Sequence, residues 1–284
     1  LIPIVLFSLF AIFFISGGVS KGNFTPFLQL ESGTNLFSSI SSTAVYIFYG
    51  FIGFETMSIV AGEMRNPEKN VPRAILGSIS IVTVLYMLII AGTIAMLGGR
   101  IMQTGAPVQD AFVEMIGPIG APLVSYGALI SIAGLNIGES IMVPRFGAAL
   151  ATEKLLVQKG LEKQTLRTAP VIVIIISGIF AFLLLLSGSF ESLATFSVVF
   201  RFFQYIPTAL AAIKLRKMYP DKKVTFRVPF GPVIPVLAVV ISILMIAGDN
   251  LMNFVWGAIG LVIASGLYFV FHGDKLHKSK ALPH

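Results

Sequence analysis

Residues 49–74, YGFIGFETMSIVAGEMRNPEKNVPRA, place two glycines and a glutamate inside an apolar run that ends in a charged cluster. Gly50 and Gly53 stand three residues apart, and glycine leaves helical backbone angles at little steric cost. We therefore expect a membrane helix that is interrupted near these glycines. The alternative is a close contact with a neighbouring helix, a role that glycines four residues apart suit better. In the charged cluster, Pro67 is expected to end this helix and Pro72 to occupy the first turn of the next one.

The composition is that of an integral membrane protein. Hydrophobic residues make up 56% of the 284 residues, charged residues make up 12%, and the mean hydropathy is +0.90. Soluble domains carry roughly a quarter charged residues. The apolar runs recur at about 20 residues, which is the length that a helix needs to cross a hydrocarbon core of about 30 Å. The sequence therefore predicts an all-α polytopic membrane protein rather than a soluble domain.

Eight apolar runs are expected to form transmembrane helices. They cover about residues 1–19, 40–63, 74–98, 121–144, 169–188, 191–213, 231–248 and 252–272. An even number of spans places both ends of the chain on the same side. We expect one transmembrane domain over residues 1–272, followed by a cytoplasmic tail over residues 273–284.

The basic residues predict the orientation. All but three of the 20 lysines and arginines lie in alternate loops and in the C-terminal tail. Of the other three, Lys21 and Arg100 lie in the remaining loops and Arg201 lies inside a predicted span. Because lysine and arginine are retained on the cytoplasmic side, both ends are expected to be cytoplasmic, in a protein of the plasma membrane. The same bias accounts for the net charge of +7, so we expect lipid headgroups rather than nucleic acid as the partner of this charge.

Several classes of chemistry are excluded. The chain has no cysteine, and its three histidines lie in or beside the polar C-terminal segment without the spacing of metal ligands. No nucleophile elbow, zinc-protease motif, P-loop or dinucleotide fingerprint is present, and no nucleophile is paired with a base within the spans. We expect no metal, no cofactor and no enzymatic activity.

Glu55 is the clearest candidate for a functional charge inside the membrane. It precedes Arg65 by ten residues, which places it about 15 Å along the helix axis from the charged cluster, near the middle of the bilayer. A carboxylate at that depth costs several kcal/mol unless it is protonated, paired or hydrated. Glu55 is therefore expected to act as a proton carrier or switch. The alternative is a neutral acid that is hydrogen-bonded to a neighbouring helix.

Two further ionisable residues fall within predicted spans. Glu139 lies six residues before Arg145, so it is either a gate or a side chain that extends toward the membrane interface. Arg201 lies near the middle of its span and needs a carboxylate or carbonyl partner, for which Glu55 and Glu139 are the candidates. It serves either in a structural ion pair or in a substrate or gating role.

Residues 48–75 closely resemble the sixth-helix signature of amino acid permeases of the amino acid/polyamine/organocation superfamily. That signature combines an aromatic-Gly-Phe-Glu core with a following Glu-x-x-Asn-Pro loop, and both are present here. Residues 135–156 resemble the eighth helix of that family, and residues 218–240 its connection from the tenth to the eleventh helix. The eight expected spans would then match the fifth to twelfth helices of a twelve-helix permease, so the chain resembles the later part of such a protein, with the first four helices absent.

The resemblance implies a fold of two inverted five-helix repeats that binds an amino acid at the midplane, between the broken first and sixth helices. Glu55 would lie just below the substrate as a proton-linked or gating carboxylate, with Glu139 and Arg201 as further gating candidates. The unwound segment, whose carbonyls would take the substrate ammonium and whose aromatic rings would line the pocket, would consist of Tyr49, Gly50, Phe51, Ile52 and Gly53.

The function predicted from these observations is secondary active transport of amino acids or related amines by alternating access. Coupling to protons is preferred over sodium because of Glu55. One alternative is a membrane receptor that senses amino acids without transporting them. Another is a half-carrier that needs a partner chain to complete its site.

Overall fold

The computed structural model describes the chain in segments, and within them the secondary structure is entirely helical. The described residues are 2–25, 35–58, 61, 64–152, 171–187, 190–219, 226, 228–248, 255, 257–260, 262, 265 and 266. They fall into two compact units. Unit 1 comprises Leu1–Glu31 with Val71–Glu139, and unit 2 comprises Ser32–Asn70 with Ser140–His284.

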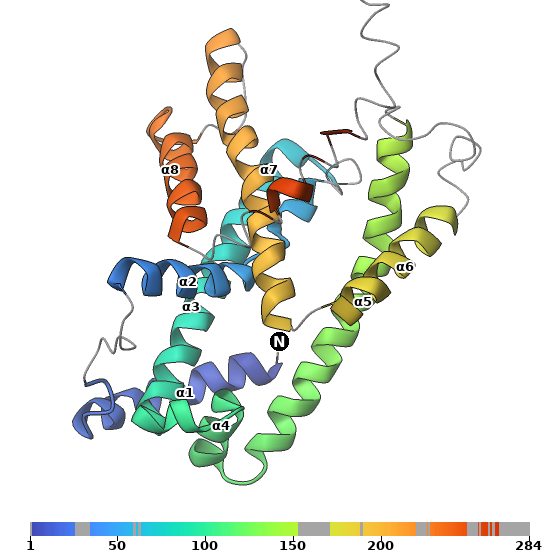
Figure 1. Ribbon diagram of the computed structural model, residues 1–284. Coiled ribbons are helices and arrows are strands. Elements are labelled where there is room, and N and C mark those ends of the chain that lie inside the picture. Colours follow the sequence, from blue (N-terminus) through green and yellow to red (C-terminus); the bar gives the residue numbers. More distant parts are fainter. Residues whose placement is uncertain are drawn as a thin grey trace, which may run out of the picture. The chain divides into compact units, whose positions relative to one another are not determined.

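Unit 1 contains one complete long helix, most of two others, and the two short helices that connect those two. Its elements are α1 (Ile2–Ser20), α3 (Pro67–Leu97, from Val71 onward), the 3₁₀ helix η3 (Gly98–Gln103), α4 (Pro107–Ile116) and α5 (Gly120–Thr152, up to Glu139). The sequence 105–122 that connects two spans therefore contains a helix of its own. That helix is α4 (Figure 1), and its first residue is Pro107, a position at which proline is favoured.

The core of unit 1 forms where α4 packs against α1. Phe7 of α1 and Phe112 of α4 are both buried, and their rings lie 5.2 Å apart between centroids. At the start of α1, Pro3 lies so close to Gly127 of α5 that a Cβ atom at residue 127 would stand 2.3 Å from the proline ring. Such close approach through a small residue is typical of helix packing inside membranes, where lipid gives little hydrophobic drive between helices.

Unit 2 is built around three helices that contact one another. Its elements are α2 (Leu36–Tyr49), the 3₁₀ helix η1 (Phe54–Ser58), α6 (Val171–Ser187), α7 (Phe190–Met218) and α8 (Val233–Gly248). Contacts join α2, α7 and α8 in all three pairs (Figure 1). Their shared core consists of Val45, Val198, Phe202 and Met245.

Four helices of the described chain are long and apolar enough to cross a membrane: Ile2–Ser20, Pro67–Gln103, Gly120–Val143 and Ser192–Met218. Three shorter apolar helices accompany them: Leu36–Tyr49, Ser177–Leu186 and Val233–Gly248. These findings fit the predicted multi-pass membrane protein, while the count of eight spans stays a prediction. Most of the last predicted span, 252–272, and all of the predicted tail, 273–284, lie outside the described residues.

The assignment of the two prolines in the charged cluster was wrong. Pro67 begins α3, and Pro72 lies inside that helix rather than in its first turn. The carbonyl of Asn66 accepts hydrogen bonds from the N–H groups of Lys69 and Asn70, both at 3.1 Å. The helix therefore begins at Pro67, about two turns before the expected start near residue 74, because a proline in the first turn sacrifices no intrahelical bond.

Candidate functional site

The interruption that the glycine spacing predicts is present. Helix α2 ends at Tyr49, and no helical residue follows until η1 begins at Phe54. Through the break, the N–H groups of Gly50, Phe51 and Ile52 each donate to the carbonyl three residues earlier, at 2.9 to 3.2 Å. The α-helical pattern, which pairs residues four apart, has already given way to tighter turns there. The observed break, residues 50–53, overlaps the expected unwound segment of residues 49–53, while Tyr49 is the last residue of α2.

Gly53 adopts a backbone conformation that side chains disfavour. Its φ angle is +123°, a region that is essentially restricted to glycine. A Cβ atom built at this residue would meet nothing within 4 Å among the described residues. The glycine is therefore needed for its backbone conformation, and close helix contact, which was the alternative reading of the pair, does not account for Gly53.

The Glu55 side chain folds back into the break and reaches across to α7. Its Oε2 accepts a hydrogen bond from the Gly53 N–H at 3.0 Å and another from the Tyr205 hydroxyl at 3.2 Å. Its Oε1 lies 2.9 Å from Nη1 of Arg201. The carboxylate therefore joins the broken segment to α7 through one backbone group and two side chains.

This ion pair is only partly shielded. The Glu55 side chain is 12% exposed and that of Arg201 is 35% exposed. Oε1 of Glu55 is buried, yet no N–H group of the described residues points at it with hydrogen-bond geometry, so its contact with Arg201 is an electrostatic one. Arg201 also donates from Nη1 to Oε1 of Gln204, at 3.2 Å. Pairing offsets much of the cost of holding both charges inside a membrane.

Aromatic rings surround the break on the α7 side. Among the described residues four ring pairs join this region to α7. The distances between ring centroids are 5.0 Å for Phe48 and Phe202, 6.2 Å for Phe48 and Tyr205, 5.7 Å for Phe54 and Tyr205, and 5.7 Å for Tyr49 and Phe190. The Phe54 and Tyr205 rings are stacked, which holds the Tyr205 hydroxyl toward the carboxylate that it contacts. Tyr49 remains 37% exposed, so its ring is accessible beside the break.

The structure brings two of the predicted charged site residues together. Of the two partners considered for Arg201, Glu55 is the one observed. Glu139 is exposed on α5 and belongs to unit 1, whereas Glu55 and Arg201 belong to unit 2. Sequence reasoning missed Tyr205, although a signal existed: a residue four positions after Arg201 lies on the same face of a helix.

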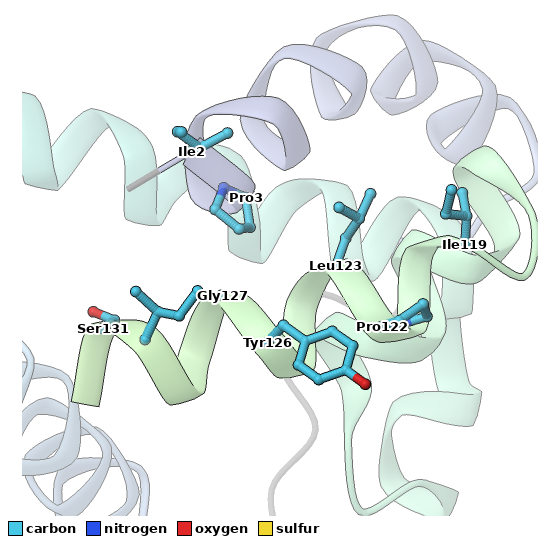
Figure 2. A pocket seen from close by; sticks show the side chains of 9 residues that line it. Ile2, Pro3, Ile119, Pro122, Leu123, Tyr126, Gly127 and Ser131 are labelled. Atoms are coloured by element: carbon cyan, nitrogen blue, oxygen red, sulfur yellow. The ribbon is translucent and has the colours of Figure 1, made fainter. Parts of the chain in front are cut away.

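Two hollows in unit 1 do not involve these residues. One, of about 600 Å³, is bordered by the first turn of α1 and by α5 (Figure 2). Its lining is almost entirely apolar and includes Pro3, Leu123 and Tyr126. The other, of about 350 Å³, lies where η3 meets α4, and the Arg100–Glu114 ion pair of 2.8 Å lines it. Among the described residues no group of three or more potential metal ligands occurs.

Comparison with known proteins identifies a family of transporters. The family model described as amino acid permease matches residues 1–272. Three curated relatives are a methylthioribose transporter and the serine/threonine exchanger SteT, both of Bacillus subtilis (strain 168), and the branched-chain amino acid permease BcaP of Lactococcus lactis subsp. cremoris (strain MG1363). Their identities to this chain are 28%, 27% and 25%.

The matches extend over nearly all of this chain but over only part of each relative. They cover 95%, 92% and 92% of the chain, and 58%, 60% and 57% of the respective relatives. The chain thus spans somewhat more than half the length of these curated relatives. The family description and the names of the relatives describe transporters rather than enzymes.

Proposed function

This chain belongs to the amino acid permease family, and we propose that it is a secondary transporter that moves amino acids or related amines by alternating access. The observation that carries the proposal is the break after Tyr49, in which the Glu55 carboxylate is held by Gly53, Tyr205 and Arg201. Broken helices at membrane depth are where secondary transporters bind their substrates and coupling ions.

The substrate is proposed to bind along residues 49–53. Backbone carbonyls that leave the helical pattern can accept hydrogen bonds from an ammonium group, and the exposed ring of Tyr49 can border the substrate side chain. Gly50, Phe51, Ile52 and Gly53 would contribute backbone groups rather than side chains. The side-chain selectivity of the site would therefore depend mainly on the neighbouring aromatic rings.

The remaining architecture is proposed on the same basis. The eight predicted spans would correspond to the fifth to twelfth helices of a permease with two inverted five-helix repeats. Both ends of this chain would be cytoplasmic, as the distribution of lysine and arginine indicates. Rocking of one helix bundle against the other around residues 49–55 would expose the site to each side in turn.

Proton coupling is proposed to act through Glu55. A protonated Glu55 would no longer attract Arg201, so proton binding would weaken the link between the break and α7. Glu139 is proposed as a separate gating residue on α5. Sodium remains the alternative coupling ion, and a dependence on the sodium gradient rather than the pH gradient would identify it.

Uptake into proteoliposomes tests this proposal. The native protein is reconstituted, and uptake of radiolabelled serine, leucine and methylthioribose is measured with an imposed pH gradient and then with an imposed sodium gradient. Glu55→Gln should abolish the response to the pH gradient while exchange of internal for external substrate continues. Glu114→Gln, which removes a carboxylate from the η3–α4 connection of unit 1, is the matched control and should respond normally.

The outcome also separates the competing functions. Unchanged pH-driven uptake in Glu55→Gln would refute the role of Glu55 in coupling. Binding without any counterflow would favour an amino acid receptor over a transporter. Uptake of methylthioribose in preference to both amino acids would instead place the chain closer in activity to the first of its three named relatives.

A further inference from the structure

We propose that Arg201, Tyr205 and the Gly53 N–H form a binding site for a carboxylate group, which Glu55 occupies in this structure and yields to the carboxylate of a ligand. This inference rests on the proposed transport function and extends it, because it names the group of the ligand that takes part in the coupling. It also assigns to Arg201 a task beyond neutralising Glu55.

The geometry is that of a carboxylate receptor. Three donors from two separate elements converge on one carboxylate: the Gly53 N–H at 3.0 Å, the Tyr205 hydroxyl at 3.2 Å and the Arg201 guanidinium at 2.9 Å. Hydrogen bonds to an ionised acceptor are about twice as strong as those between neutral groups, and arginine is the side chain best suited to bind a carboxylate. Each of the three donors would serve an incoming carboxylate equally well.

Glu55 fills this site imperfectly. Glu55 follows Gly53 by only two residues, so the backbone restricts how its carboxylate can be oriented. The buried Oε1 atom faces Arg201 without an aligned hydrogen bond. Arginine and carboxylate bind most strongly through two parallel hydrogen bonds. A carboxylate on a free ligand has no such tether and could adopt that arrangement, and the exposed third of the Arg201 side chain leaves an edge for its approach.

Protonation of Glu55 would open the site without leaving a net charge behind. Before the exchange, the negative Glu55 balances the positive Arg201. Afterwards the proton resides on Glu55, and the ligand carboxylate balances Arg201. One proton and one carboxylate therefore enter together, and the total charge of the site stays the same. The exchange avoids an unpaired charge inside the membrane, which would be costly.

Among the described residues, the helices around the site offer few other groups that could interfere. Within the part of the chain that the structure describes, the titratable side chains that contact Glu55 are Arg201 and Tyr205 of helix α7. The other two helices of the unit 2 core, α2 and α8, contain no aspartate, glutamate, lysine, arginine or histidine. The tyrosines of α2 are Tyr46 and Tyr49, which are both partly exposed. The charge of the site is therefore set by the Glu55–Arg201 pair.

Chemical modification of Arg201 tests the proposal without requiring transport. The native protein in detergent is treated with phenylglyoxal, which attacks accessible guanidinium groups, and modification of each arginine is measured by peptide mass spectrometry. Arg73, which is exposed on α3, serves as the internal reference. Modification of Arg201 relative to Arg73 should rise about tenfold in Glu55→Gln, since the paired carboxylate is removed. Propionate should reverse this rise, and propionamide, which has the same shape without the charge, should not.

A measurement on the unmutated protein guards against misfolding of the variant. The modification ratio of Arg201 to Arg73 should increase as the pH falls and Glu55 becomes protonated, and propionate should suppress that increase. Equal protection by propionate and propionamide would overturn the proposal, as would an Arg201 that stays unreactive in Glu55→Gln. If these results hold while proteoliposomes show no uptake, the carboxylate site stands and the transport proposal fails.

Discussion

Replacing Gly53 with alanine should destabilise the break through the backbone alone. The φ angle of +123° lies in a region that costs a residue with a side chain about 1–3 kcal/mol. No steric term adds to this, because the new Cβ would meet nothing within 4 Å among the described residues. We therefore expect Gly53→Ala to lose about 1–3 kcal/mol of stability, or to relax its backbone and withdraw the Gly53 N–H from Glu55.

Gly77→Ala is the matched control for this change. Gly77 lies inside α3, has no positive φ angle, and likewise has nothing within 4 Å of its would-be Cβ. Alanine in a helix is favoured over glycine by about 1 kcal/mol, so this variant should be as stable as the parent or more so. Thermal unfolding in detergent, followed through the fluorescence of the one tryptophan, compares the three proteins. A Gly53→Ala protein with unchanged melting temperature and unchanged pH-driven uptake would refute the requirement for a glycine conformation at the break.

Two further predictions follow from single contacts. Gly127→Ala should lower the melting temperature and cost about 1–3 kcal/mol, because the added methyl group would overlap the ring of Pro3, whereas Gly134→Ala on the same helix meets no neighbour and should have little effect. Equal melting temperatures for these two variants would contradict the close packing of α1 on α5. Tyr205→Phe removes one hydrogen bond to Glu55, worth about 1 kcal/mol, and should lower the melting temperature because α7 is held less firmly to the broken segment. An unchanged melting temperature in Tyr205→Phe would contradict that reasoning.

Hydropathy located the helices well where a helix and an apolar run of the sequence end together. The first span was expected over residues 1–19 and is observed as Ile2–Ser20, and the run expected over 231–248 is observed as Val233–Gly248. The pattern did worse for α3 and α5, which begin or end within polar sequence. Hydropathy reports where the apolar environment stops, but charged residues are good helix formers and allow the helix to continue.

The break was predictable because it depends on residues that are adjacent in sequence. The spacing of Gly50 and Gly53 already implied a local departure from the helix. The partner of Arg201 is different in kind, since it is set by how α7 packs against the broken segment. Sequence alone left two acidic candidates, and nothing in the spacing along the chain distinguishes them. Tyr205 was missed for the same reason, because its task depends on a carboxylate that lies 150 positions away in sequence.

The conformation of the break and the charge of Glu55 are tied together by one side chain. Oε2 of Glu55 holds the N–H of Gly53, whose unusual backbone angle creates the break, while Oε1 faces Arg201 on α7. Because the side chain is short, movement of α7 away from the break must either stretch the ion pair or release the Gly53 N–H. Conversely, a proton on Glu55 weakens both contacts at once. A ligand carboxylate that takes over Arg201 would therefore free the broken segment to change shape at the moment when the charge of the site is rebalanced.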